Sequence, residues 1–405
     1  MSKIRIKNFG PIKEGYQSKN GWMNITNVTV FIGSQGSGKS TVAKLISTLS
    51  WIEKALVRGD FDPKKLTVRL FKRHISFQNI GEYFKDNSVI EYQGRAYHIS
   101  YKDGNVSVIK NEENGYVFPK IMYVPSERNF VSSVRNVSTL KGLPSTLYTF
   151  SDEFIKAVEE LKGQIDLPIN NSRFEYQKLS KHSSIIGEDY KISLSEASSG
   201  FQSFVPLFIV SSYLANSLTE KGDNATREIS IEDEKRIRKE IEQILSNRNI
   251  SDDVKKASLE FLSSKFSYSS FINIVEEPEQ NLFPTSQRHI LNSLIRFKNV
   301  NEDNKLIITT HSPYIITYLS IAIQGGTLKD KKLSKELLHR LNEIVPVDST
   351  LKAAEVCIYQ LDEKDGCIND LANFEGIPSD KNYLNQLLAE GNSQFDSLLE
   401  IEQEI

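Results

Sequence analysis

The residues best suited to chemistry lie at positions 33–41, where the chain reads Gly-Ser-Gln-Gly-Ser-Gly-Lys-Ser-Thr. This run fits G-x-x-x-x-G-K-[ST], in which glycines let successive backbone N–H groups point inward at phosphate oxygens. The lysine would reach the β- and γ-phosphates of a nucleotide, and the serine hydroxyl after it would bind Mg²⁺. The predicted phosphate-binding residues are Gly33, Ser34, Gln35, Gly36, Ser37, Gly38, Lys39, Ser40 and Thr41.

Acidic side chains follow a second apolar segment, at residues 271–275. They form the run Glu276-Glu277-Pro278-Glu279. A strand that ends in acids beside a phosphate loop can hold Mg²⁺ and the attacking water. One carboxylate orients the metal, and the next accepts a proton from the water. A solvated acidic turn is the alternative for this run alone, and the other motifs favour the catalytic interpretation.

A histidine ends the next predicted strand, at residues 306–310. His311 is followed by Ser312, which suits the N-cap of a helix, and by Pro313, which suits its first turn. A histidine at this place can touch a γ-phosphate and so report its presence. A lone histidine is more often structural, but the position one strand after the double glutamate favours the functional interpretation.

A second anion-binding helix start is predicted at Ser199 and Gly200, just before an apolar helix over 201–218. Free N–H groups, a hydroxyl and the positive end of the helix dipole together favour a phosphate. The chain already has one phosphate loop. The second helix start therefore indicates a two-fold sandwich, in which this turn of one copy faces the ATP held by the other copy.

Alternating strands and helices around a phosphate loop predict a mostly parallel sheet. Residues 1–50 read as strand, turn, strand, loop and helix. Further helices are expected over 51–75, 147–163, 201–218, 231–263, 285–298 and 313–323. Further strands are expected over 271–275 and 305–309, and short antiparallel strands with an apolar strand at 120–124 are expected within 88–124. Residues 164–192 read as a polar stretch.

The composition excludes several classes of protein. The chain has 405 residues and a net charge of −2, so no global basic field indicates nucleic-acid binding. No apolar run approaches the ~20 residues that span a bilayer, and the start lacks a signal-peptide core. Cys357 and Cys367 are too few for a disulfide framework. We expect a cytoplasmic protein without membrane contact.

The order of these motifs resembles that of the ABC-type ATPases of the SMC/RecF/OLD group. The resemblance is greatest to compact bacterial AAA-domain ATPases with EEPE-x-x-L-F-P and T-T-H-S-P motifs, which match residues 276–284 and 309–313. The opening strand at 6–12 and the segment 123–128 also match, so the resemblance covers most of the chain.

The resemblance implies a role for each matching residue. The implied catalytic residues are Lys39, Glu277 as general base and His311 as γ-phosphate switch. The implied Mg²⁺-side residues are Ser40 and Glu276, and Thr41 would add a phosphate contact. Ser199 and Gly200 would contact ATP in trans, and Asn281 with Leu282 would lie in the loop that communicates across a dimer.

Three departures from the family pattern are visible. Glu276 stands where most such ATPases carry Asp, which leaves its direct contact with the metal open. The run Ser-Ser-Gly-Phe-Gln at 198–202 differs from the transporter form Ser-Gly-Gly-Gln and argues against a transporter subunit. The usual glutamine that senses the γ-phosphate is not evident. Gln78 is a weak candidate, and a surface glutamine is the alternative.

The resemblance implies an α/β P-loop NTPase fold with an ABC-type head, in which a mostly parallel core sheet is joined by an antiparallel β layer and a helical lobe. We expect residues 1–405 to form one such head. Within it, 51–125 would hold an inserted helix and the antiparallel layer, and 194–270 the helix after Gly200 with a helical lobe. Residues 271–405 would complete the core with a hairpin and helices.

The implied function is an ATP-driven switch that uses Mg²⁺, forms a homodimer or larger homo-oligomer and controls a separately encoded effector such as a nuclease. Similar ATPases, such as the PtuA type, act in anti-phage defence. The first alternative is a RecF/SMC-like DNA-binding ATPase, with nucleic acid on the basic cluster at 64–74. A solvated helix face is the plainer interpretation of that cluster.

Two further alternatives are weaker. An OLD-type nuclease would need metal ligands such as Asp362, Glu363 and Asp365, but the segment 356–370 reads better as a hairpin. A transporter ATPase subunit is disfavoured by the missing transporter motif.

Overall fold

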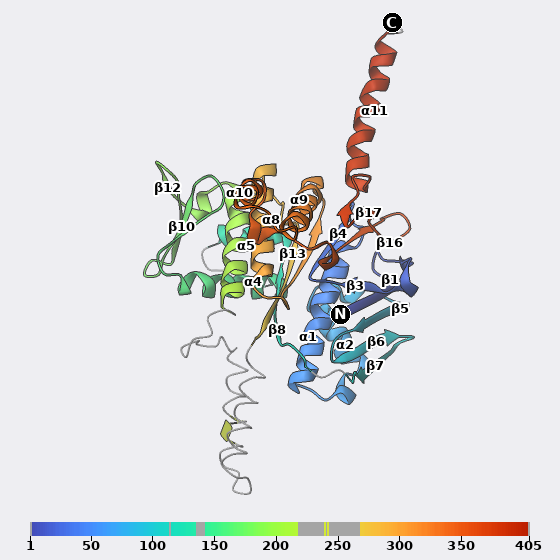
Figure 1. The fold of residues 1–405 in the computed structure, drawn as a ribbon. Helices are drawn as coiled ribbons and strands as arrows, with labels where there is room; N and C mark the ends of the chain where they lie inside the picture. The colour runs from blue at the N-terminus through green and yellow to red at the C-terminus, as the bar shows by residue number, and fades with distance from the viewer. Residues whose placement is uncertain are drawn as a thin grey trace.

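The computed structural model describes residues 2–112, 115–134, 142–217 and 268–403, together with residues 239, 241 and 242. The chain folds around a central sheet with helices on both faces, and a single long helix leads away from this body (Figure 1). The predicted helix over 231–263 lies outside the described residues except at 239, 241 and 242, which are helical.

The central sheet has the strand order β2-β16-β15-β4-β14-β13-β8 among the described strands. Five neighbours run parallel: β15 (Val356–Leu361), β4 (Val28–Gly33), β14 (Lys305–Thr310), β13 (Ser270–Glu276) and β8 (Pro119–Val124). β16 (Cys367–Asp370) pairs antiparallel with β15 and parallel with β2 (Gly15–Tyr16). The mostly parallel sheet is therefore confirmed.

One face of this sheet is covered by α1 (Lys39–Arg58) and an antiparallel sheet of order β3-β1-β5-β6-β7. Its strands are β3 (Met23–Ile25), β1 (Ser2–Phe9), β5 (Phe84–Gln93), β6 (Tyr97–Lys102) and β7 (Asn105–Lys110). Apolar side chains of α1 such as Leu45 and Leu49 share one buried cluster with Ile4 of β1 and Ile307 of β14. α1 therefore joins the two sheets.

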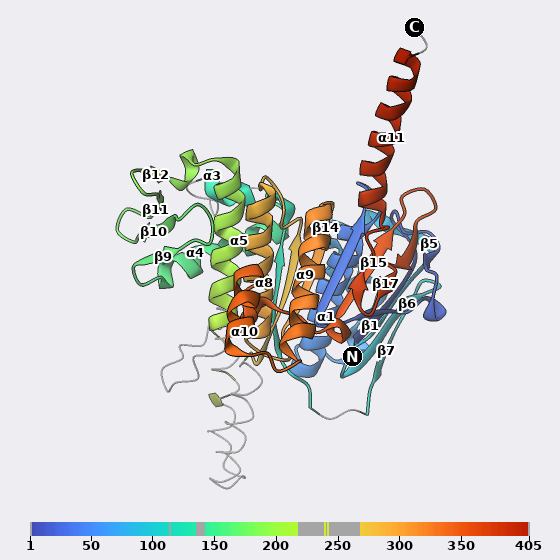
Figure 2. The ribbon, with the colours of Figure 1, turned by 45° about the horizontal axis from the view of Figure 1, so that its top comes forward.

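The other face carries α5 (Ser199–Asn216), α8 (Pro284–Asn299) and α9 (Pro313–Lys329), with α4 (Ser145–Glu160) beside α5 (Figure 2). Successive side chains of β4 point to opposite faces of the sheet, so β4 contributes to the apolar cluster on each face. Val28, Val30 and Ile32 belong to the cluster under these helices, while Phe31 faces the α1 side. A strand buried on both faces reads as a continuous apolar run, as β4 does.

A small antiparallel sheet of order β12-β11-β10-β9 lies beyond α4 and α5. Its strands are β9 (Gln164–Asp166), β10 (Arg173–Gln177), β11 (His182–Ile186) and β12 (Lys191–Ser193). The sequence predicts only a polar stretch over this region, residues 164–192. Phe174 and Ile185 are fully buried beneath the sheet and attach it to the main core.

The observed bounds of the helices differ in places from the expected ones. The helix expected over 51–75 is two helices: α1 ends at Gly59, which has a φ of +80°, and α2 (Val68–Ser76) follows a short turn containing Pro63. α3 (Phe130–Ser133), α10 (Lys335–Ile344), the short pair β17 (Asn373–Phe374) and β18 (Ile377–Pro378), and α11 (Tyr383–Gln403) complete the description.

The antiparallel layer differs from its expected range. It takes β1 and β3 from before residue 51, and the strand expected at 120–124 is instead β8 of the parallel sheet. The predicted hairpin near 356–370 is present as β15 and β16. The proposed domain boundaries themselves stay a prediction.

Candidate active site

The phosphate loop connects β4 to α1 and begins at Gly33. Gly33 has a φ of +151°, and a Cβ there would lie 2.4 Å from the Leu361 carbonyl oxygen of β15. Only glycine fits this position, because both the backbone angle and the close neighbouring strand exclude a side chain. The Ser37 hydroxyl donates to the Ser34 carbonyl oxygen at 2.9 Å and closes the loop.

Lys39 lies at the first position of α1 with only 5% of its surface exposed. Its Nζ donates to the carbonyl oxygens of Gly33 at 2.9 Å and Ser34 at 2.7 Å. Burial lowers the pKa of Lys39 to about 8, although nearby carboxylates, Glu277 first among them, act in the opposite direction. The Lys39 side chain is therefore folded back onto the carbonyl groups of its own loop.

The two glutamates lie at the carboxyl end of β13. Because β13, β14 and β4 are parallel and in register, Glu276, Thr309 and Phe31 lie in one row across the sheet. Glu277, the next residue, has a φ of +44°. A left-handed backbone at a residue other than glycine is strained and persists only when its surroundings hold it.

Arg128 is the group that holds this turn. It is fully buried, and its guanidinium donates to the carbonyl oxygens of Glu276 at 2.7 Å, Glu277 at 2.6 Å and Ser203 at 3.2 Å. Burial lowers the pKa of Arg128 to about 10. The segment after β8 is therefore tied both to the glutamate turn and to α5.

His311 lies between the phosphate loop and the glutamates. Its Nε2 is 3.2 Å from Glu277 Oε1, and its Nδ1 is 3.4 Å from Lys39 Nζ. Both contacts fit a neutral imidazole protonated on Nε2, which donates to the carboxylate while Nδ1 accepts from the ammonium. The hydrogen bond from His311 lowers the pKa of Glu277, and burial opposes this shift.

Glu279 positions the histidine. Its Oε1 accepts hydrogen bonds from Thr310 Oγ1 and from the His311 backbone N–H, both at 2.7 Å. Burial raises the pKa of Glu279. The sequence shows this residue only as part of the acidic run and does not predict its contacts with Thr310 and His311, which lie 31 and 32 positions further along the chain.

Glu276 has the features of a metal-side acid. Its Oε2 accepts from the Ser126 backbone N–H at 3.3 Å, and its Oε1 is buried without a hydrogen-bond partner among the described residues. A buried carboxylate oxygen without a partner fits a hard cation or a water bound to it. The residues therefore fit Mg²⁺, with Ser40 and Glu276 as the side chains that would hold it.

Ser199 and Gly200 begin α5, away from the loop of their own chain. Ser199 is exposed, and no hydrogen bond in the described structure joins either residue to positions 33–41. A Cβ at Gly200 would lie 3.1 Å from the Asn281 carbonyl oxygen, and Asn281 Nδ2 donates to Ser203 Oγ at 3.2 Å. The start of α5 and the segment after the glutamates are thus packed together.

The predicted hairpin β15–β16 adds a contact to the phosphate loop that the sequence does not predict. The Ser34 hydroxyl donates to the Glu363 carboxylate. Asp362 and Asp365 instead accept from the backbone N–H groups of Lys364 and Cys367, at 2.7 and 2.9 Å. The three acids considered for a nuclease thus serve the hairpin turn and the phosphate loop.

Gln78 lies elsewhere. It is buried, and its amide nitrogen donates to Ser47 Oγ of α1 at 3.3 Å. Among the residues that the structure describes, its contacts do not include the loop, the glutamates or His311.

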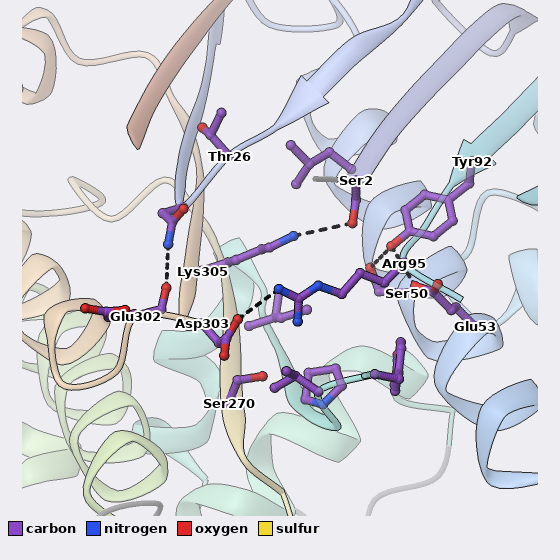
Figure 3. Close-up of a pocket in the computed structure, with 16 residues that line it drawn as sticks. Ser2, Thr26, Ser50, Glu53, Tyr92, Arg95, Ser270, Glu302, Asp303 and Lys305 are labelled. Carbon is purple, nitrogen blue, oxygen red and sulfur yellow. Dashed lines mark hydrogen bonds and ion pairs between the residues drawn. The ribbon is translucent and has the colours of Figure 1, made fainter. Parts of the chain in front are cut away.

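A polar cavity of about 390 Å³ lies at the opposite ends of the parallel strands (Figure 3). Lys305 donates to Ser2 Oγ at 3.4 Å, and Arg95 pairs with Asp303 at 3.3 Å. Glu53 accepts from the backbone N–H groups of residues 96 and 97. These charged groups fasten the antiparallel sheet to α1 and β14, and the cavity contains none of the motif residues.

Comparison with known proteins gives one family match. The model of the AAA ATPase domain matches residues 254–316, a range that includes Glu276, Glu277 and His311. No curated protein matches the chain. Within the described residues, no helix is both long and apolar enough to cross a membrane.

Solved structures give distant likenesses. The SMC head domain from Thermotoga maritima has 10% identity and a TM-score of 0.37, with 92% of this chain and 98% of that one covered. The Smc head with an extended coiled coil, bound to the C-terminal domain of ScpA derived from Pyrococcus furiosus, has 8% identity and a TM-score of 0.32, with coverages of 91% and 96%. A dimeric ATP-binding cassette bound to ADP and phosphate has 11% identity and a TM-score of 0.27, with coverages of 92% and 100%.

The phosphate loop, the glutamate pair and the histidine meet at one edge of a parallel sheet, and the family model covers two of these three motifs. The chain therefore combines the phosphate loop of P-loop ATPases at residues 33–41 with a match to the AAA ATPase domain over residues 254–316.

Proposed function

We propose that two copies of the chain close around two ATP molecules, hydrolyse them with Mg²⁺, and thereby control a separately encoded effector. The main observation behind this proposal is that one histidine joins two catalytic groups: His311 contacts Lys39 on one side and Glu277 on the other. A nucleotide phosphate on Lys39 would lie beside the histidine that holds the glutamate. Binding and catalysis would then be coupled through one imidazole.

The side chains have distinct tasks in this proposal. Lys39 exchanges the carbonyl oxygens of its own loop for phosphate oxygens, which carry full negative charge. His311 turns its donor toward the γ-phosphate and releases Glu277. Without this hydrogen bond the pKa of Glu277 rises toward its ordinary value, and the carboxylate becomes a better general base for water. Mg²⁺, held by Ser40 and Glu276, would neutralise charge on the phosphates.

The second copy supplies Ser199 and Gly200. Ser199 is exposed, and it begins a helix of 18 residues whose first N–H groups are free to bind an anion. No hydrogen bond among the described residues joins either of them to the loop of its own chain, which supports a contact in trans. Because Gly200 packs against Asn281, a movement of the α5 start when the dimer closes would also move the turn that carries the glutamates.

The effector and its setting rest on the sequence resemblance. The motifs at 276–284 and 309–313 resemble those of anti-phage ATPases of the PtuA type. We infer a role in bacterial anti-phage defence, in the cytoplasm, with an effector such as a nuclease. A nuclease reading frame beside the gene would support this assignment, and neighbours unrelated to defence would count against it.

The proposal is tested by Glu277→Gln. This variant keeps the shape of the site but lacks the base, so it should bind ATP and hydrolyse it about 10²- to 10⁴-fold more slowly. Its mass in light scattering should be larger with Mg²⁺ and ATP than without nucleotide. The matched control adds Lys39→Ala, which should abolish both binding and the ATP-dependent increase. A variant that binds ATP without any increase in mass would contradict the sandwich.

A further inference from the structure

α11 stands away from the rest of the molecule. In both Figure 1 and Figure 2 it leads outward from the hairpin side of the central sheet. Among the described residues, the hydrogen bonds that join it to the body lie at its start, where the Tyr383 N–H donates to Gln360 Oε1 at 3.1 Å. Isolated helices are marginal in water because most helical stability comes from packing. A helix of 21 residues in this position is suited to a partner.

α11 carries an apolar face with acidic charges only. Five of its apolar side chains are between 40% and 62% exposed: Leu387, Phe395, Leu398, Leu399 and Ile401. At 3.6 residues per turn these positions fall on one side of the helix. Residues 383–405 contain five acidic residues and no lysine or arginine. Any surface that receives this helix should therefore be apolar and basic.

Such a surface lies on α1 and α2. A cavity of about 290 Å³ is lined by the aromatic residues Trp51, His74 and Phe77 and by the polar residues Ser47, Thr48, Arg73 and Gln78. Trp51 is 38% exposed and Phe77 50% exposed. The His74 ring lies 5.0 Å from Trp51, and burial lowers the pKa of His74. Exposed aromatic rings around a cavity are typical anchors for a partner side chain.

Exposed cations border this cavity. Arg73 lines it, and Arg69 lies one turn earlier on the same face of α2. Lys64 and Lys65 lie on the preceding turn. None of these four side chains forms an ion pair with another residue in the described part of the chain, so their charges are open to a partner. The acidic helix and the basic cavity are complementary in both charge and polarity.

We propose that α11 of one copy docks into the cavity between α1 and α2 of a second copy. Within one chain α11 leads away from α1 and α2, so the contact forms between copies (Figure 1). Different surfaces of the two copies meet, which makes the contact heterologous and able to build rings or filaments. It needs no nucleotide and is separate from the ATP-dependent sandwich.

Charge reversal tests this contact. The cavity variant carries Arg69→Glu with Arg73→Glu, and the helix variant carries Glu390→Lys with Glu402→Lys. Without nucleotide, the wild-type chain should assemble beyond one copy in light scattering, and each variant alone should return to the mass of one chain. An equimolar mixture of the two variants should assemble again, because the reversed charges now attract.

Controls separate this contact from folding and from ATP. Asp396→Lys with Glu400→Lys changes charge on the opposite face of α11 and should leave assembly unchanged. Lys39→Ala should also assemble as the wild type does. A wild-type chain that is monomeric without nucleotide, or a mixture that fails to assemble, would overturn the proposal. So would a cavity variant that keeps its mass and instead loses binding to a labelled single-stranded DNA, which would assign the basic cavity to nucleic acid.

Discussion

At the scale of single residues, the site is built on one imidazole between a cation and a carboxylate. His311 contacts both Lys39 and Glu277, so a change at any of the three alters the other two. The sequence predicted these three residues, because their motifs have fixed spacing around a loop, a strand end and a helix start. It did not reveal Glu279, whose role exists only once β13 and β14 are side by side.

Lys39 makes ATP binding depend on pH. Its pKa is lowered to about 8 in the free protein, so the neutral form gains population as the pH rises through 8. ATP needs the charged form, and affinity should fall about tenfold between pH 7 and pH 9, because Lys39 takes up one proton when ATP binds. Isothermal titration at pH 8.5, in two buffers of different ionisation enthalpy, should show this uptake. Equal affinities at pH 7 and pH 9 would contradict the burial of this ammonium.

His311→Ala should move the acid limb of the ATPase profile. The hydrogen bond from His311 lowers the pKa of Glu277, so activity that needs the ionised glutamate extends to low pH. Without the histidine this pKa rises, and the residual activity should fall off at a higher pH than in the wild type. The pH profile of kcat/KM from pH 4.5 to 7 reports the groups of the free protein, in which His311 holds Glu277, and so measures the shift. An unchanged acid limb with lower overall rate would mean that the contact does not control the base.

At the scale of elements, Arg128 connects three parts of the site. It stands in the segment 123–128 that the sequence marks by resemblance, but its burial and its bonds to backbone oxygens could not be read from the sequence. The segment after β8, the turn after β13 and the helix α5 meet only in the folded chain. The expected single helix over 51–75 was wrong, because Gly59 caps the end of α1 and Pro63 lies in the turn before α2. Strands β9 to β12, of three to five residues each, were too short and too polar to show a pattern.

Arg128→Met should destabilise the fold by about 3 kcal/mol, because it leaves buried carbonyl oxygens without donors. The strained turn at Glu277 would lose its support, and ATP hydrolysis should fall further than the loss of stability explains. Urea unfolding and ATPase rates measure the two effects. Arg128→Lys keeps the charge but presents fewer fixed donors, so it should lie between the wild type and the Met variant. A stable, fully active Met variant would contradict the claim that Arg128 supports the glutamate turn.

At the scale of the whole molecule, the head is divided by its central sheet into two apolar clusters. One lies under α1 and the antiparallel sheet, and the other under α5, α8 and α9. The loop and histidine project from the edge between them, and Ser199 lies on the far layer. The parallel sheet could be predicted, because buried runs such as 28–33 are continuous and apolar. The hairpin contact from Glu363 to the loop could not, since it depends on β15 lying beside β4.

The central claim is that each ATP is held by the loop of one copy and by Ser199 with Gly200 of another, and mixing two inactive variants tests it most directly. Lys39→Ala removes the loop function, and Ser199→Arg removes the trans contact. Neither variant should hydrolyse ATP alone. Their mixture forms one intact site for each mixed pair, so it should regain measurable hydrolysis in a single-turnover assay. A mixture no more active than the sum of its two components would contradict the shared site.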